Sequence, residues 1–439
     1  MKISLISLGC AKNRIDSELV LGVARKYNIE ITPDIYDADV IFINTCGFIE
    51  SSKKESIDTI LEVYENKKKN VKIVAIGCLV ERYYDDLIKA LPEVDIYLPI
   101  RDYDNIDQLF MKLTSSNKSY KLSYLDRVIT TSPYSAYLKI GDGCNNRCAY
   151  CAIPLIRGNY HSRDFDEIMA EAKLLADKGI KEITLIAQDT TVYGTDFKND
   201  NRRLNNLLHE ISLIENIKII RVLYLYPDEI TKEILNEIKN NPKVVKYFDI
   251  PIQHSSNRIL KSMNRRGSKE LIRQHISNIR KEIPSAIIRT TLITGFPGET
   301  DEDFNDLLSF VKEIKFERLG CFTYSDEDDT AAKSYPNKVN HRTAEKRHRL
   351  IMEAQTKIAE EFNKSLIGNH YNCIIDEYDE GNLAYIGRNY MYAPDDVDGK
   401  IYIYSPIELE IGSIVEVEIV NSTTYDLEAK SINPNVDNF

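Results

Sequence analysis

The sequence contains no uninterrupted apolar run near the roughly 18 residues that a membrane-spanning helix requires. Its first residues, MKISLISLGCAKNRIDSELV, also lack the long apolar core and cleavage site of a secretory signal. Internal repeats and long low-complexity segments are absent too, and 43% of the residues are apolar, which excludes a fibrous or disordered chain. These features predict a cytoplasmic globular protein without membrane association, long enough for about three domains.

Cysteine is sparse, with eight residues, and a reducing cytoplasm disfavours disulfide bonds between them. Six of the eight fall into two sets of three. Such sets in a cytoplasmic chain are typically metal ligands or catalytic groups. Cys321 and Cys373 join neither set, and we expect them to be structural.

Three apolar runs in the first hundred residues end in a cysteine each: KISLISLGC, ADVIFINTC and VKIVAIGC. Helical-looking polar segments separate them, a pattern that predicts an N-terminal parallel α/β domain over residues 1–113. The cysteines are Cys10, Cys46 and Cys78. Because the carboxyl ends of parallel strands lie along one edge of a sheet, we expect the three thiols to converge there. Three separately buried core thiols are the alternative.

A polar, irregular segment, residues 113–135, separates this domain from a second one. In residues 134–364 six strand patterns alternate with mostly amphipathic stretches, which predicts a partial α/β barrel with six strands. Residues 366–439 differ, because YNCIIDEY, NLAYIGR, KIYIYS and SIVEVEIV alternate as short antiparallel strands do. We expect a small antiparallel β-barrel there.

The segment KIGDGCNNRCAYC places Cys144, Cys148 and Cys151 directly after the first predicted strand of the second domain. A structural zinc ion or a fully ligated iron–sulfur cluster takes four protein ligands. Three thiolates would therefore leave one iron of a 4Fe-4S cluster open as a binding site. A zinc ion with a remote fourth ligand is the alternative interpretation.

The C-x3-C-x2-C spacing and its position resemble the radical S-adenosylmethionine superfamily over roughly residues 134–364. The resemblance implies that the open iron chelates the methionine part of S-adenosylmethionine, whose reductive cleavage gives a 5′-deoxyadenosyl radical. It also implies nucleotide contacts, near adenine or the methionine amino group, from six residues: Tyr150, Ile153, Gln188, Asp189, Gly295 and Phe296.

With the second set, Cys10, Cys46 and Cys78, the resemblance extends over nearly the whole chain, to the methylthiotransferase family of that superfamily. Its members combine an auxiliary-cluster domain, a radical barrel and a TRAM-type β-barrel in this order. The resemblance implies a second 4Fe-4S cluster whose open iron holds the sulfur to be inserted. It further implies S-adenosylmethionine as both radical source and methyl donor, and an electron-donor protein as a partner.

Local motifs favour the branch that methylthiolates the β-carbon of an aspartate in small-subunit ribosomal protein twelve. SLGCAKNRIDSE, NTCGFIESSKKESIDTI and MNRRGS resemble that branch, whereas the tRNA-modifying branch typically has Gly-Cys-Gln-Met-Asn at the first cysteine. Arg265 and Arg266 of MNRRGS are expected either to touch substrate or to form an exposed pair. Two alternatives stay open: an enzyme that modifies isopentenylated adenosine in tRNA, and a non-enzymatic iron–sulfur sensor on ribosomes.

The net charge of −11 resides entirely in residues 366–439, which hold fourteen acidic and three basic side chains. The rest of the chain holds 54 of each. RNA affinity depends largely on Lys and Arg that neutralise phosphates, so direct RNA binding by this segment is not expected. An acidic surface would attract a basic ribosomal protein, although it could also serve solubility alone.

Overall fold

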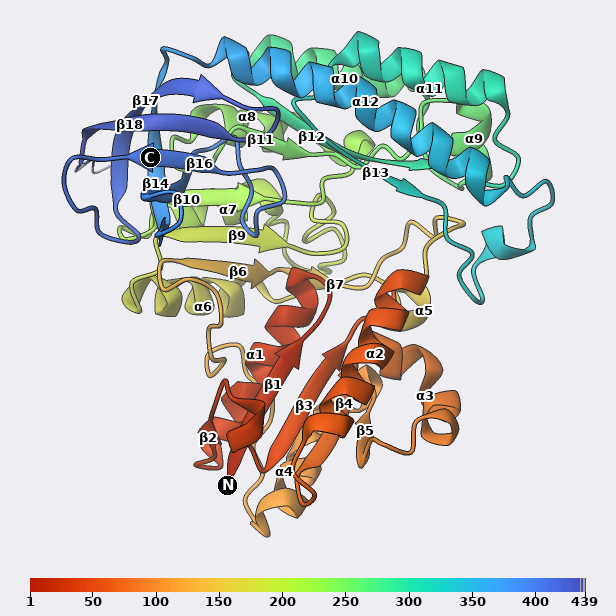
Figure 1. Cartoon of the computed structure of the whole chain (residues 1–439), viewed down its shortest axis with the longest axis vertical. Helices are drawn as coiled ribbons and strands as arrows, with labels where there is room; N and C mark the ends of the chain where they lie inside the picture. The colour runs from red at the N-terminus through yellow and green to blue at the C-terminus, as the bar shows by residue number, and fades with distance from the viewer. Residues whose placement is uncertain (435, 437–438) are drawn as a thin grey trace.

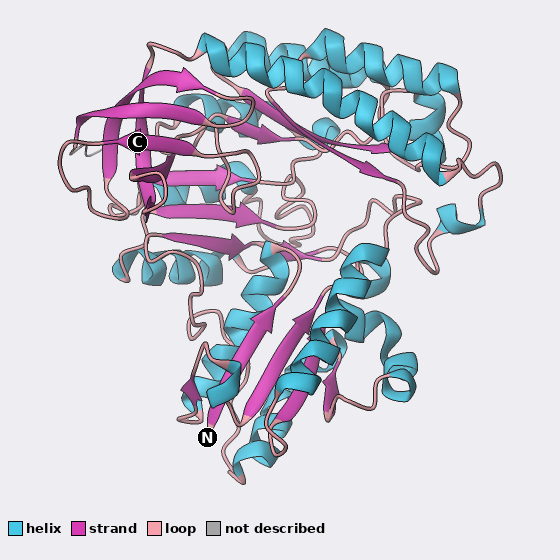
Figure 2. Cartoon of the chain, in the orientation of Figure 1, coloured by secondary structure: helices cyan, strands magenta, loops and turns pink. Residues whose placement is uncertain are grey.

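The computed structural model describes residues 1–434, 436 and 439, so Asp437, one of the acidic residues counted above, lies outside the described residues. The N-terminal region lies below a central half-barrel, and the C-terminal region lies at the side of that half-barrel (Figure 1). Helices accompany the strands of the first two regions, whereas the third is built from strands (Figure 2). Among the described residues, no helix combines the length and apolar character needed to cross a membrane.

The N-terminal region is a parallel sheet with the order β2-β1-β3-β4-β5. Its elements are β1 (Lys2–Ser7), α1 (Ala11–Lys26), β2 (Glu30–Ile31), η1 (Ile35–Asp37), β3 (Val40–Thr45), α2 (Glu50–Asn66), β4 (Lys72–Gly77), α3 (Cys78–Ala90), β5 (Ile96–Leu98), η2 (Ile100–Asn105) and α4 (Ile106–Thr114). β3 is buried throughout because Phe42 packs with α1 and α4, and Ile43 with α2 and α3. The predicted parallel α/β architecture is confirmed.

Six parallel strands form the half-barrel as two sheets, β10-β9-β6 and β11-β12-β13, joined by an isolated bridge between Ile220 and Val244. The elements are β6 (Ser135–Lys139), β7 (Gly141–Asp142), α5 (Ile153–Arg157), β8 (His161–Ser162), α6 (Phe165–Asp177), β9 (Glu182–Ile186), α7 (Leu204–Ser212), β10 (Ile219–Val222), η3 (Pro227–Glu229), α8 (Lys232–Asn240), β11 (Tyr247–Asp249), α9 (Asn257–Ser262), α10 (Lys269–Glu282), β12 (Ile287–Thr294), α11 (Asp301–Ile314), β13 (Arg318–Thr323), η4 (Ala331–Ser334) and α12 (His341–Ser365). The predicted partial barrel is confirmed.

The C-terminal region closes into a barrel in the order β14-β15-β16-β18-β17. Its described strands are β14 (His370–Asp379), β15 (Ala384–Arg388), β16 (Ile401–Tyr404), β17 (Ile414–Ser422) and β18 (Leu427–Asn433). All neighbours pair antiparallel, as expected, except β16 and β18, which pair parallel because β17 intervenes between them in the chain. β18 is not among the strands predicted from the sequence, since only Leu427 and Ala429 of LEAKSIN are buried apolar residues.

A buried ion pair and a hydrogen bond fix the C-terminal barrel to the half-barrel, and Arg388 also pairs within the barrel. Arg388 Nη2 lies 2.8 Å from Glu182 Oε2 at the start of β9, and Arg388 Nε lies 2.8 Å from Asp376 Oδ2. Asp398 Oδ2 accepts a 2.6 Å hydrogen bond from the hydroxyl of Tyr247. Some carboxylates of the tail therefore have partners inside the protein, and the negative charge exposed to solvent is smaller than the net charge of −11 counted from the sequence.

Candidate functional site

Both sets of cysteines face one cavity of about 540 Å³ between the N-terminal region and the half-barrel. β1 and β3 point their carboxyl ends at the half-barrel (Figure 1). We call Cys10, Cys46 and Cys78 the N-terminal triad, and Cys144, Cys148 and Cys151 the barrel triad; all six line the cavity. The structure thus brings together two sets of thiols that lie far apart in the sequence.

Each member of the N-terminal triad follows a strand of the parallel sheet. Cys10 precedes α1, Cys46 follows β3, and Cys78 begins α3 directly after β4. The loops approach one another closely: a Cβ on Gly9, at φ +85°, would lie 2.9 Å from Cys46 Cβ. A Cβ on Gly77, at φ +97°, would lie 2.1 Å from the side chain of Asn44. Glycine is therefore required at both positions for the three thiols to converge.

Asn13 connects the loops that carry the N-terminal triad. Its amide nitrogen donates to the carbonyls of Leu8 at 3.1 Å and Thr45 at 3.0 Å, while its oxygen accepts from Cys78 Sγ at 3.1 Å. Asn13 is not among the residues predicted from the sequence, although it lies in the first turn of α1, three residues after Cys10. A single buried amide thus organises all three loops.

The barrel triad lies on an irregular loop between β7 and α5. The backbone N–H of Cys144 donates to Gly158 O at 3.1 Å, and that of Ala149 donates to Met263 O at 2.8 Å. These bonds come from the end of α5 and from the residue after α9, so neighbouring elements hold a loop that has no regular structure of its own.

One arginine contacts one thiol in each triad. Arg157 Nη2 lies 3.4 Å from Cys78 Sγ, and Arg265 Nη1 lies 3.7 Å from Cys148 Sγ. Arg265 is buried, so the expectation of an exposed pair is wrong for this residue, whereas Arg266 is half-exposed. Arg157 is not among the predicted residues, and no sequence pattern marks it because its partner lies in another region. Both guanidinium groups can offset negative charge at a thiolate.

Burial governs the protonation of the thiols. It raises the pKa of Cys78 and of Cys151 to about 12, and it also raises the pKa of Cys46 and of Cys144. The positive charge of Arg157 opposes the shift at Cys78. Buried thiols of this kind stay protonated unless a metal replaces the proton. The cavity therefore favours thiolates only together with iron or a cation.

Tyr150, Ile153 and Gln188 line the cavity, and their contact with a nucleotide stays a prediction. Gln188 Nε2 donates to Asp142 Oδ1 at 2.8 Å. Gln188 Oε1 is buried and has no hydrogen-bond partner among the described residues. An unpaired acceptor in a cavity wall suits a donor on a ligand, such as the ammonium group of S-adenosylmethionine.

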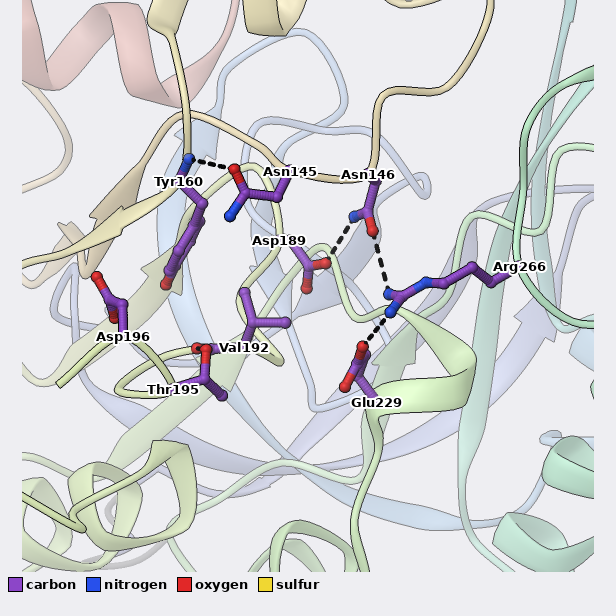
Figure 3. A pocket seen from close by; sticks show the side chains of 9 residues that line it. All are labelled: Asn145, Asn146, Tyr160, Asp189, Val192, Thr195, Asp196, Glu229 and Arg266. Carbon is purple, nitrogen blue, oxygen red and sulfur yellow. Dashed lines mark hydrogen bonds and ion pairs between the residues drawn. The ribbon is translucent and has the colours of Figure 1, made fainter. Parts of the chain in front are cut away.

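Asp189 lies in a neighbouring pocket of about 370 Å³ rather than in the wall of the cavity (Figure 3). Its carboxylate accepts from Asn146 Nδ2 at 2.8 Å and from Thr191 Oγ1 at 2.5 Å, and burial raises its pKa. Asn146 accepts in turn from Arg266 at 3.1 Å (Figure 3). Asp189 thus supports the barrel-triad loop from behind, and its direct contact with a nucleotide stays a prediction.

Gly295 and Phe296 do not line the cavity either. The Phe296 ring is fully buried behind Tyr150, edge-to-face with ring centroids 6.5 Å apart. A Cβ on Gly295, at φ +77°, would lie 2.4 Å from the Cβ of Ala344 in α12. Both backbone N–H groups donate to Glu299. The turn therefore positions Tyr150, and contact of Gly295 or Phe296 with adenine stays a prediction.

Buried charges join the two regions beside the cavity. Asp16 of α1 pairs with Arg157 at 2.7 Å and with Lys139 at 2.9 Å. Lys139 also pairs with Asp142 at 2.9 Å, and all four side chains are largely buried. Removing one partner of such a network typically costs about 3–5 kcal/mol, because a charge is left buried without compensation. The network therefore keeps the triads facing each other.

The donor set fits iron–sulfur clusters better than a single ion. Among the described residues, no group of three or more His, Cys, Asp or Glu could hold one metal ion. A cluster instead takes each cysteine on a separate iron, so its thiols need not converge on a point. Two sets of three thiols, each with a nearby guanidinium, suit two such clusters.

Three family models match the chain in succession. The uncharacterized protein family UPF0004 matches residues 2–99, the radical SAM superfamily matches residues 138–311, and the TRAM domain matches residues 367–432. Among solved structures, the radical S-adenosylmethionine methyltransferase TsrM from Kitasatospora setae gives a TM-score of 0.54 at 11% identity, covering 73% of this chain and 72% of that chain. That likeness shows the fold. The fold, the matches and the site together define a radical SAM enzyme.

Relatives narrow the class. The chain is 48% identical to the ribosomal protein uS12 methylthiotransferase RimO of Clostridium novyi (strain NT), over 97% of each chain. It is 45% identical to the protein of the same name from Clostridioides difficile (strain 630), over 97% of this chain and 98% of the relative. The chain therefore belongs to the family of ribosomal protein uS12 methylthiotransferases.

Proposed function

We propose that this chain attaches a methylthio group to the β-carbon of an aspartate in ribosomal protein uS12, the small-subunit protein twelve of the sequence analysis. The observation that carries the proposal is the meeting of two three-cysteine sets at one cavity. The reaction removes hydrogen from a carbon atom and then attaches sulfur to the same atom. The group that generates the radical and the group that donates sulfur must therefore both lie within reach of that carbon. The acceptor in this proposal, ribosomal protein uS12, is taken from the names of the relatives.

The residues of the barrel triad would hold a 4Fe-4S cluster, and S-adenosylmethionine bound there supplies a radical that removes hydrogen from unactivated carbon. Gln188 Oε1, which has no partner in the described part of the chain, would accept from the methionine ammonium group. Tyr150 and Ile153 line the same wall and would exclude water from the nucleotide. Arg265 offsets the charge of Cys148.

The residues of the N-terminal triad would hold a second 4Fe-4S cluster, with Arg157 beside Cys78. The proposal includes S-adenosylmethionine as methyl donor, an external electron-donor protein, and a cytoplasmic location, where free thiols persist. It also retains the division into domains at residues 1–113, 134–364 and 366–439. The ends of α4 at Thr114 and α12 at Ser365 support that division.

The proposed function is tested by offering two acceptors to the reconstituted protein under reduction. We expect mass spectrometry to find methylthiolation of purified uS12, or of the small subunit, and none on isopentenylated tRNA. Methylthiolation of the tRNA alone would restore the tRNA-modifying alternative. A protein that binds ribosomes without cleaving S-adenosylmethionine would instead be the sensor.

The exposed carboxylates of the C-terminal barrel are predicted to speed the encounter with basic uS12. Glu377, Glu380, Glu408 and Glu410 are exposed, and changing all four to Gln removes charge with little change of shape. We expect the KM for uS12 to rise several-fold at low salt, because the attractive field is weakened. The rise should shrink as salt is added, since exposed charges are screened over about 8 Å at physiological salt.

A matched control changes two exposed carboxylates far from the tail, Glu62 and Glu65 of α2, to Gln. An equal effect per charge removed in this control would mean that net charge, rather than the position of the charges on the barrel, sets the KM. Deleting the whole tail is a poorer test, because it would strip Glu182 of its partner Arg388.

A further inference from the structure

Four cationic side chains line the cavity in the described part of the chain, and three have polar partners. Arg157 and Arg265 contact the triads as described above, and Arg289 forms a 2.9 Å ion pair with a carboxylate of β11. Lys12 differs from these three. Among the described residues its ammonium group has no hydrogen-bond or ion-pair partner, and it lies 3.1 Å from the ring centroid of Tyr224.

Lys12 is only 7% exposed, so most of its side chain is removed from solvent while its ammonium group borders the cavity. A buried cation without an anion is costly, which makes such a group informative where it borders a cavity. The face of the Tyr224 ring compensates in part through a cation–π interaction. A carboxylate supplied by a ligand would complete the compensation.

The support beneath Lys12 is built into the backbone. Tyr224 has φ +63°, a left-handed conformation that is uncommon for a large side chain and that concentrates at ligand sites. Its N–H donates to Asp249 Oδ2 at 3.0 Å, and Asp249 is held by Arg289. The ring is therefore fixed where it presents the ammonium group of Lys12 to the cavity.

We propose that Lys12 binds the side-chain carboxylate of the acceptor aspartate, an assignment that rests on the proposed function. In aspartate the carboxylate carbon is bonded directly to the β-carbon, so fixing the carboxylate fixes the reacting carbon within one bond. Lys12 lies two residues after Cys10 and lines the same cavity as the barrel triad, which places that carbon within reach of both triads. An isopentenylated adenine base has no carboxylate for Lys12 to bind, so this contact would be made with the aspartate acceptor only.

The test compares Lys12→Met, which keeps the aliphatic stem and removes the charge, with Lys26→Met at the far end of the same helix. Both are studied as reconstituted holoenzymes with purified uS12. We expect Lys12→Met to raise the KM for uS12, and the Kd measured without reductant, at least tenfold. Lys26→Met should change neither by more than about twofold. Formation of 5′-deoxyadenosine without acceptor is measured for both variants and should be unchanged in Lys26→Met. If Lys12→Met fails to load its clusters, Lys12→Gln repeats the test.

The second arm changes the acceptor. Wild-type holoenzyme should bind uS12 carrying Asn in place of its target Asp at least tenfold more weakly, whereas Lys12→Met should bind the two forms alike. Undiminished discrimination by Lys12→Met would overturn the assignment. A raised KM of Lys12→Met for S-adenosylmethionine would overturn it as well, because it would mean that Lys12 binds the methionine carboxylate instead. If wild-type holoenzyme itself neither binds nor modifies uS12, the proposed function fails, and the role of Lys12 with it.

Discussion

Replacing Cys144, Cys148 and Cys151 together with alanine should lower the iron content from about eight to about four per chain. The rate of 5′-deoxyadenosine formation by the same variant should fall more than about a thousandfold, because the residues proposed to hold the cluster act as a unit. Methylthiolation should be lost with it. The measurement is iron analysis and product quantification after anaerobic reconstitution.

Cys321→Ala is the matched control, since Cys321 is a buried thiol of the same half-barrel that does not line the cavity. It should keep both clusters and its activity. Only four irons in the fully reconstituted unaltered protein would contradict the assignment of two clusters.

The second large effect concerns the division of labour between the triads. Cys10→Ala should abolish methylthiolation while retaining some 5′-deoxyadenosine formation, because in the proposed function the N-terminal triad would present sulfur and the barrel triad would serve the radical. Cys10 is the most suitable member to change, since it is exposed, whereas Cys46 and Cys78 are buried. Cleavage and acceptor modification are measured side by side in the same reaction.

Cys373→Ala in the C-terminal barrel controls for the loss of a thiol elsewhere. Normal product formation by a variant that has been shown to lack the second cluster would reject this division. Parallel loss of both activities in Cys10→Ala would mean that the triads do not function independently.

The fold and the cysteines could be predicted because their signals are local. Each apolar run that ends in Cys46 or Cys78 predicts the strand that it forms. Because the carboxyl ends of parallel strands lie along one edge of a sheet, it also predicts that the two cysteines lie at that edge. β2 and β5 escape such prediction, because elements of two or three residues show no periodicity. β18 escapes it because little of it is apolar.

The surroundings of the cysteines could not be predicted, because they depend on contacts between regions. Arg157 matters through Cys78 and Asp16, which precede it by 79 and 141 positions. Lys12 is conspicuous only once the structure shows that it has no anionic partner among the described residues. Glycine at position 295 is explained by α12, which no local pattern places beside it.

The attachment of the C-terminal barrel limits how an acceptor can enter. α12, with 25 residues, spans about 37 Å and runs without a break towards that barrel, which Arg388 then locks to Glu182. A ribosomal protein bound to the outer strands of this barrel would therefore be held at a fixed distance from the six thiols. Because α12 and this ion pair tie the barrel to the half-barrel, we expect an acceptor bound on the barrel to reach the cavity with a flexible loop of its own rather than through movement of the barrel.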